Sequence, residues 1–398
     1  MSSLAEAIRN RIVHRMMADR SRPEAIEKHV HWLARHDSRF QHQAGLCKAV
    51  ADQTVQGQSQ LRVSSVQMNA CTVRSGKEYA ELIYRLAARA ACAGAAVVVF
   101  PEYSGLPLMG LIPGVQKGLN SERSLDETVS SIGGSDTQVL DVFRLLGPYA
   151  HNAYTAAFSA VARELGLYIV TGSMILLDET GGKQALRNMG HVFGPRGERV
   201  GRYQKLHLMP AEAGWGIEPG STLATFKLGN IVAAAPICMD ATYFESFRLA
   251  RSAGADVVVV PVANDEDYNL WYALRGIWPR VQESQVFGIS SCMVGSFAGF
   301  KFTGRSAILC PMELSPGGDG ILAQASTHDK EEVVTASMNL AALYAFRAAN
   351  PLRFNPSLYQ QYAPHMYSSA QLARKAQAEA RAAKAAGQAV HEEDGELQ

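Results

Sequence analysis

The sequence lacks long uncharged apolar segments and has almost no net charge. None of its segments reaches the roughly 18 consecutive apolar residues that a membrane-spanning helix needs, and charges interrupt the apolar positions at the start of the chain, unlike in a secretion signal. The formal net charge is +1, from 38 basic and 37 acidic residues, so no global field favours nucleic acid or a charged membrane as partner. These absences predict a cytoplasmic protein that acts on a small molecule.

Paired-cysteine patterns and the motifs of several other hydrolase classes are also missing. A chain of 398 residues needs no covalent staples, so we expect reduced thiols, one of which can be a nucleophile. GRSAI at 304–308 lacks the final glycine of a serine-nucleophile elbow. His29 and His31 are near neighbours, but no H-E-x-x-H motif occurs, and we expect no metal and no cofactor. The six cysteines are Cys47, Cys71, Cys92, Cys238, Cys292 and Cys310.

What the chain does contain is ample apolar material for a core, since hydrophobic residues make up 47% and charged residues 19%. Residues 1–60 combine apolar residues at helical spacing with a polar, Gln-rich stretch, which predicts a helical hairpin and a linker. Residues 351–398 include an Ala-rich segment, which predicts a solvated C-terminal helix with a frayed end. Residues 61–350 are expected to form the main domain.

The main domain alternates β-like and helical patterns. Several of its strands are rich in Val and Ile without polar alternation, as in a sheet that is covered on both faces. This pattern predicts a layered α/β architecture. The expected helices are 77–93, 154–165 and 243–253, and the expected strands are 61–68, 96–100, 168–177, 189–193, 225–228, 231–237, 257–261, 286–294 and 307–310.

Reactive side chains follow three apolar segments. Glu102 follows VVVFP, Lys205 lies among apolar and aromatic neighbours in GRYQKLHL, and Cys238 precedes a turn into a helix. Singly, each also fits an ordinary interpretation: a solvated loop glutamate, a lysine extending from a strand end, or a buried core cysteine. Together they form a chemical set, because a carboxylate can take the thiol proton, the thiolate can attack an unsaturated carbon, and an ammonium can stabilise an oxyanion.

In these segments the chain resembles the nitrilase superfamily, also called the carbon-nitrogen hydrolases, whose catalytic set is a Glu, a Lys and a Cys in that order. The matching residues are Glu102 in FPEYSG, Lys205 in GRYQKLHL and Cys238 in ICMD. The resemblance implies a four-layer αββα sandwich and association into homodimers or larger assemblies. Further similar segments are RNMGHVFGPRGERVGRYQK (187–205), PRVQESQVFGISS (279–291, with Arg280 and Glu283), FTGRSAILCP (302–311) and VVTASMNLAALYAFR (333–347).

The resemblance also implies a second glutamate after the lysine, and Glu212 in MPAEAGWG is the matching position. We expect the Met239 N–H to contribute to an oxyanion site. Tyr103, Trp215 and the acidic stretch 265–267 lie near the motifs, and we expect them to line the substrate pocket.

The residues after the nucleophile bear on the substrate. Nitrilases proper follow the cysteine with Trp-Glu, whereas amidase and carbamoylase branches place an aspartate two positions on, as Asp240 does here. Met239 departs from the family's usual aromatic residue. The resemblance therefore implies hydrolysis of an amide or carbamoyl group through a cysteine thioester, with Asp240 near the substrate. The alternatives are a nitrilase acting on a nitrile, and a catalytically silent member that serves as a binding or assembly protein.

Overall fold

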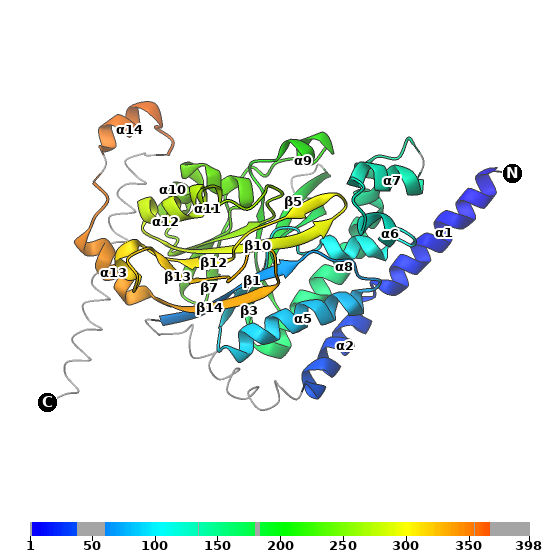
Figure 1. Ribbon diagram of the computed structural model, residues 1–398, viewed down its shortest axis with the longest axis horizontal. Coiled ribbons are helices and arrows are strands. Elements are labelled where there is room, and N and C mark those ends of the chain that lie inside the picture. The colour runs from blue at the N-terminus through cyan, green and yellow to red at the C-terminus, as the bar shows by residue number, and fades with distance from the viewer. Residues whose placement is uncertain (1, 38–59, 134, 180–183, 354, 367–398) are drawn as a thin grey trace.

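The computed structural model describes residues 2–37, 60–133, 135–179, 184–353 and 355–366 (Figure 1). The predicted linker before residue 60 and the Ala-rich tail lie outside these ranges. The helices are α1 (Ser2–Arg20), α2 (Pro23–His36), α5 (Gly76–Cys92), α6 (Gln116–Leu119), α7 (Leu125–Gly133), α8 (Val139–Leu165), α9 (Pro210–Gly214), α10 (Phe244–Ser252), α11 (Leu270–Arg275), α12 (Ile277–Ser284), α13 (Leu340–Ala349) and α14 (Pro356–Tyr362), with 3₁₀ turns η1 (Leu106–Leu111), η3 (Cys238–Thr242) and η4 (Met312–Leu314).

The strands join into one curled sheet whose central path runs β4-β5-β3-β2-β1-β10-β9-β8-β7. Strands β1, β2 and β3 are parallel to one another, as are β10, β9 and β8. The strands are β1 (Gln60–Asn69), β2 (Val97–Val99), β3 (Tyr168–Val170), β4 (Met174–Asp178), β5 (Ala185–Phe193), β6 (Arg199–Gln204), β7 (Thr225–Leu228), β8 (Ile231–Ala234), β9 (Val257–Val262), β10 (Phe287–Phe297), β11 (Phe300–Phe302), β12 (Ala307–Leu309), β13 (Ile321–Gln324) and β14 (Glu332–Asn339).

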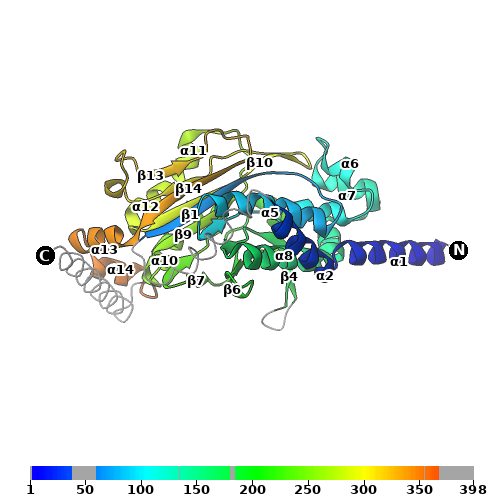
Figure 2. The ribbon, with the colours of Figure 1, turned by 90° about the horizontal axis from the view of Figure 1, so that it is seen from below.

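Alternating side chains within single strands establish the layers. In β2, Val98 packs in a core with residues of α5 and α8, whereas Val97 points into a central core between the two halves of the sheet. In β9, Val257 joins the same central core, whereas Val258 packs with residues of α10 and α12. Because neighbouring strand residues point to opposite faces, the order of layers is helix, sheet, sheet, helix. The predicted layered α/β fold is confirmed (Figures 1 and 2).

Strand β1 connects the two halves of the sheet. It pairs in parallel with β2 through Val63 and Val97, and its last residues pair in parallel with β10 through Met68 and Met293. The carboxyl ends of strands from both halves therefore meet in one region, the usual position for a ligand in a sheet of this type.

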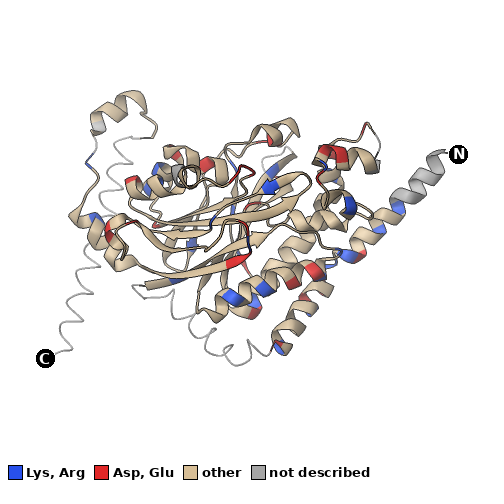
Figure 3. Ribbon diagram, viewed as in Figure 1, with Lys and Arg blue, Asp and Glu red and all other residues tan. Residues whose placement is uncertain are grey.

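The two predicted N-terminal helices are present, but α2 continues in the general direction of α1 and does not fold back on it as a hairpin (Figures 1 and 2). Pro23 begins α2, whose buried Ile26 and Val30 pack in the core that also holds residues of α5 and α8. Basic and acidic residues are interspersed along α2 and α5 (Figure 3). Among the helices of the described ranges, none combines the length and the apolar character that a membrane span requires.

Two elements differ from their predicted bounds. Helix α8 begins at Val139 and accommodates Pro148 within it, so it is much longer than the segment 154–165. The expected strand 168–177 is divided into β3 and β4 by a turn at Gly172, whose φ is +73°. A Cβ at Gly172 would lie 1.8 Å from the carbonyl oxygen of Pro101. The glycine thus allows the turn to pass directly beside the residue that precedes Glu102.

Candidate active site

Glu102 lies just after β2 and is only 1% exposed. Its Oε1 accepts hydrogen bonds from Lys205 Nζ at 2.8 Å and from Asn188 Nδ2 at 2.9 Å. Its Oε2 accepts the backbone N–H of Ala263, the residue after β9, at 3.0 Å. The carboxylate is therefore oriented by donors from both halves of the sheet.

Lys205 follows β6 and is equally buried. Its ammonium lies between two carboxylates, 2.8 Å from Glu102 Oε1 and 2.7 Å from Glu212 Oε2. Its backbone N–H donates to the carbonyl of Asn188 on β5 at 2.8 Å. The antiparallel pairing of β5 with β6 therefore brings the lysine to the glutamates.

Glu212 lies in the short helix α9 and is also buried. Its Oε2 accepts the Met209 N–H at 2.8 Å, and its Oε1 accepts hydrogen bonds from the Tyr103 hydroxyl and from Asn188 Nδ2. The structure thus brings the second glutamate that the sequence suggested into direct contact with Lys205.

Cys238 begins the 3₁₀ turn η3 beyond the end of β8 and has a φ of +45°. A non-glycine residue in the left-handed region is uncommon and is typical of a sharp elbow that presents a side chain at a site. Cys238 is partly exposed, and its thiol lies close enough to Glu102 for the carboxylate charge to affect it. The three sequence-predicted reactive groups, Glu102, Lys205 and Cys238, therefore converge.

The ionisation of these groups is set by burial and by their mutual charges. Burial raises the pKa of Glu102 above its usual value, against the opposing effect of the Lys205 charge. Burial would lower the pKa of Lys205, but Glu102 and Glu212 outweigh it and raise that pKa. Burial would raise the pKa of Glu212, but the Lys205 charge and hydrogen bond outweigh it and lower that pKa. Burial and the nearby Glu102 carboxylate raise the pKa of the Cys238 thiol well above its ordinary value.

Asp240 does not line the cavity beside Cys238, although the sequence suggested a position near the substrate. It is fully buried, and its carboxylate accepts the backbone N–H groups of Leu206, His207 and Ile237, together with a hydrogen bond to the His207 ring. The carboxylate is used to tie the segment after Lys205 to the segment before Cys238. Its neighbour Met239, by contrast, lines the cavity.

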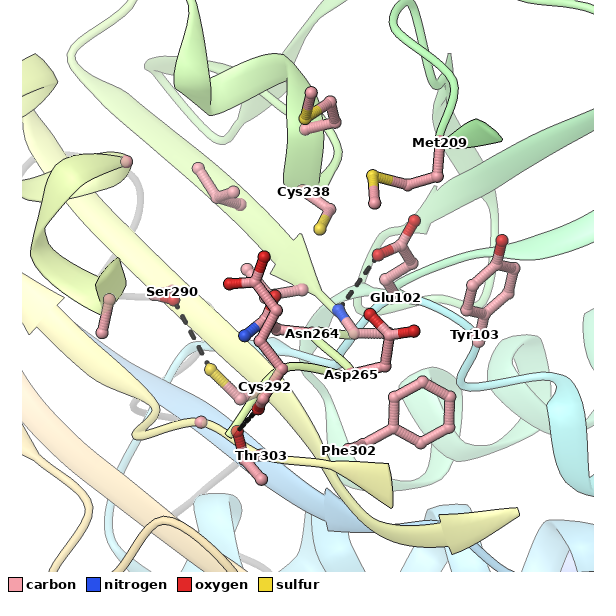
Figure 4. Close-up of a pocket in the computed structure, with 18 of the residues that line it drawn as sticks. Glu102, Tyr103, Met209, Cys238, Asn264, Asp265, Ser290, Cys292, Phe302 and Thr303 are labelled. Carbon is pink, nitrogen blue, oxygen red and sulfur yellow. Dashed lines mark hydrogen bonds between the residues drawn. The ribbon is translucent and has the colours of Figure 1, made fainter. Parts of the chain in front are cut away.

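A cavity of about 440 Å³ opens over Cys238, Glu102 and Lys205. In Figure 4 the Cys238 side chain and the Glu102 carboxylate point into this space, with Asp265 and Phe302 on another part of its wall. Tyr103 and Trp215 line it, as the sequence suggested. Of the acidic stretch 265–267, Asp265 and Glu266 belong to the lining. Within the described ranges, no cluster of His, Cys, Asp and Glu side chains is suited to hold a metal ion.

Asn188 was missed by the sequence analysis although its amide contacts both buried glutamates. The available signal was a single amide in the otherwise mostly apolar stretch 185–193, directly before the segment that leads to the lysine. The contribution of the Ala263 N–H could not be found in the same way, because any residue other than proline offers this donor.

The chain matches a known protein family over most of its length. A family model described as carbon-nitrogen hydrolase matches residues 62–348. A nitrilase of Pyrococcus abyssi is 30% identical over 281 residues, which cover 70% of this chain and 90% of that protein. The omega-amidase NIT2 of Homo sapiens is 27% identical over 213 residues, covering 50% of this chain and 71% of that protein.

Solved structures share the fold at lower sequence identity. One is a mutant of the amidase from Nesterenkonia sp. AN1 that shows covalent addition of the acetamide moiety of fluoroacetamide at its active site cysteine; its TM-score is 0.53 at 18% identity, covering 76% of this chain and 96% of that chain. Another is Nit3 of Saccharomyces cerevisiae, a member of branch 10 of the nitrilase superfamily, with a TM-score of 0.53 at 16% identity, covering 75% of this chain and 98% of that chain.

Proposed function

The chain belongs to the carbon-nitrogen hydrolase family, and from this premise we propose that it is a hydrolytic enzyme that cleaves an amide or carbamoyl group of a small molecule through a thioester on Cys238. The observation that carries the proposal is the buried arrangement of Glu102, Lys205 and Glu212 beside the partly exposed thiol, at the floor of one cavity. Burying three charged groups costs stability. Such clusters are therefore typical of functional sites, where the chemistry requires them.

In the first half of the proposed reaction, the Cys238 sulfur attacks the substrate carbonyl carbon while Glu102 accepts the thiol proton. The carbonyl oxygen gains negative charge, which the Lys205 ammonium and the Met239 N–H stabilise. When the tetrahedral intermediate collapses, the carbon-nitrogen bond breaks and Glu102 returns its proton to the departing nitrogen. Ammonia or an amine leaves, and the acyl group remains on sulfur as a thioester.

In the second half, water replaces the leaving group. Glu102 accepts a proton from the water as the oxygen attacks the thioester carbonyl, and the same two donors stabilise the oxyanion. The carbon-sulfur bond then breaks, the acid product leaves, and the proton returns to the thiol. Glu212 contributes by holding Lys205 through its 2.7 Å contact.

We favour an amide or carbamoyl substrate over a nitrile. Asp240 stands where the amidase and carbamoylase branches have their aspartate, and amidases and omega-amidases are among the relatives. A nitrile is the second candidate substrate, because one relative is named a nitrilase. Both reactions can use the same catalytic groups, so only substrate turnover separates them.

The test is a panel of aliphatic and aromatic amides, ureido acids and nitriles, assayed for ammonia and for the acid product. We expect turnover of an amide or ureido acid that is lost in Cys238→Ala and falls at least about 100-fold in Glu102→Gln. Cys92→Ala is the matched control, since Cys92 is an exposed cysteine on α5, and this variant should keep full activity. Efficient nitrile turnover with inert amides would overturn the substrate class, and normal turnover by Cys238→Ala would overturn the mechanism.

A catalytically silent binding or assembly protein is the remaining alternative from another class. It would gain nothing from an activated thiol. Because Glu102 can take the thiol proton as sulfur attacks, we expect iodoacetamide to modify Cys238 faster than it modifies the buried Cys292, as peptide mass spectrometry can measure, and Glu102→Gln to slow this modification. If Cys238 is alkylated no faster than the buried Cys292, the silent alternative is supported instead.

A further inference from the structure

Asn188 is placed at the centre of the buried charges. It lies on β5 with 1% of its surface exposed. Its Nδ2 donates to Glu102 Oε1 at 2.9 Å and to Glu212 Oε1 at 2.8 Å. Lys205 Nζ contacts the same two carboxylates from its own position at 2.8 Å and 2.7 Å. One amide and one ammonium therefore close a ring with the two glutamates.

The orientation of this amide is determined by its neighbours. Two acceptor oxygens face it, so the NH₂ group must point toward them, whereas a flipped amide would place Oδ1 against two carboxylates. In agreement, Oδ1 is buried without a hydrogen-bond partner in the structure. Leaving the buried Oδ1 without a donor costs free energy. The same orientation lets Nδ2 make two hydrogen bonds to charged carboxylates, which are stronger than bonds between neutral groups.

The strand register explains how Asn188 comes to lie beside Lys205. Met189 pairs with Gln204 in the β5–β6 ladder, and the preceding carbonyl of Asn188 accepts the Lys205 N–H. Residues directly opposite in an antiparallel pair project their side chains to the same face. Asn188 and Lys205 are therefore delivered together to the carboxylates.

We propose that Asn188 is a positioning residue that holds Glu102 and Glu212 at fixed places around Lys205 and keeps Glu102 ionised to receive the thiol proton; this role rests on the proposed function. The ionisable groups that face Glu102 are Lys205, Glu212, Cys238 and Tyr103. Of these, only Lys205 is cationic, and it is shared with Glu212. The neutral donor of Asn188 separates the two carboxylates without adding charge.

The test replaces Asn188 with two residues of similar size. Asn188→Asp substitutes a third carboxylate for the donor, and Asn188→Leu removes the donor without adding charge. Asn152→Asp makes the same exchange on the exposed side of α8 and serves as the matched control. The readouts are the pH dependence of Cys238 alkylation by iodoacetamide and, with a substrate from the panel, the pH profile of kcat and KM.

For Asn188→Asp we expect the acid limb of both profiles to move upward by about one pH unit or more, because neighbouring carboxylates oppose each other's ionisation. For Asn188→Leu we expect a smaller upward shift, since a hydrogen bond to the ionised form is lost. In both variants kcat at neutral pH should fall about tenfold or more while KM changes about twofold or less. Asn152→Asp should retain wild-type profiles.

Folded Asn188 variants with wild-type alkylation profiles would overturn the positioning role. If the aspartate variant does not fold, the leucine variant carries the same test, and failure of both to accumulate as folded protein would make Asn188 structural and equally overturn the proposal. The alkylation arm needs no substrate. A shifted alkylation profile in a protein that hydrolyses none of the panel would therefore refute the proposed function and leave the role of Asn188 intact.

Discussion

Replacing Lys205 with methionine tests how the buried charges are balanced. Methionine keeps an unbranched chain of similar length but removes the ammonium. Glu102 and Glu212 then remain buried, with Asn188 and Tyr103 as their side-chain donors. Two neighbouring carboxylates cannot both stay ionised in such a setting, so one of them should take up a proton when the protein folds.

The expected magnitude follows from the loss of one partner of a buried ion pair, which costs about 3–5 kcal/mol of the free energy of unfolding. Unfolded glutamate titrates near about 4.3, and the carboxyl of the folded variant titrates above this value. Between the two pKa values the folded state binds more protons than the unfolded state. The free energy of unfolding of the variant should therefore fall as the pH rises through this window, by about 1.4 kcal/mol for each unit that separates the two pKa values.

Urea denaturation at about pH 5.5 and about pH 8 measures this effect. Lys205→Met should lose more stability relative to wild type at the higher pH, and the double variant Lys205→Met, Glu212→Gln should recover at least about 2 kcal/mol there by removing one charge. Hydrolysis should stay at least about 100-fold reduced in both variants, because the oxyanion has lost its cation. An equal stability loss at both pH values, with no recovery in the double variant, would refute the charge-balance argument.

Three further measurements follow from the structure. Burial lowers the pKa of His191 from 6.5 to about 3. Between these values the folded state binds fewer protons than the unfolded state, so the free energy of unfolding should fall as the pH drops through this interval. In urea denaturation, His191→Phe should lose less of its free energy of unfolding than wild type over the same range. Gly172→Ala should cost about 2 kcal/mol or more in thermal melts because of the 1.8 Å approach to Pro101, whereas Gly254→Ala, also at positive φ but with open space around it, should cost less. Light scattering at micromolar concentration should show at least a dimer, since α10 and α11 expose large apolar side chains; a monomer would contradict this.

The sequence located the elements and reactive groups whose signals are local. Glu102 and Cys238 could be found because each follows an apolar segment, and the layered fold because strands without polar alternation require cover on both faces. The direction of a side chain at a turn is not a local signal. Asp240 therefore looked like a substrate contact, although its carboxylate accepts the backbone N–H groups of Leu206, after Lys205, and of Ile237, directly before the elbow.

Features that depend on register or on close approach were outside the reach of the sequence. The contacts of Asn188 depend on the pairing of β5 with β6 and on the position of α9, which carries Glu212. The turn at Gly172 interrupts what reads as one apolar strand, and the close approach of Pro101, which is remote in the chain, leaves room only for a glycine there. The expected helix 154–165 likewise omitted the first half of α8, which continues through Gly147 and Pro148 with many of its residues buried.

The charges also determine how the proposed nucleophile must act. The pKa of the Cys238 thiol is raised well above its ordinary value by burial and by the Glu102 carboxylate, so the resting thiol keeps its proton. The Lys205 charge lowers this pKa, but burial and the Glu102 carboxylate outweigh it. A preformed thiolate would add a further negative charge beside two carboxylates that share one ammonium. The thiol proton must therefore move to Glu102 as sulfur attacks, which leaves the total charge of the group unchanged, and the Lys205 ammonium remains in place to stabilise the negative charge that develops on the substrate oxygen.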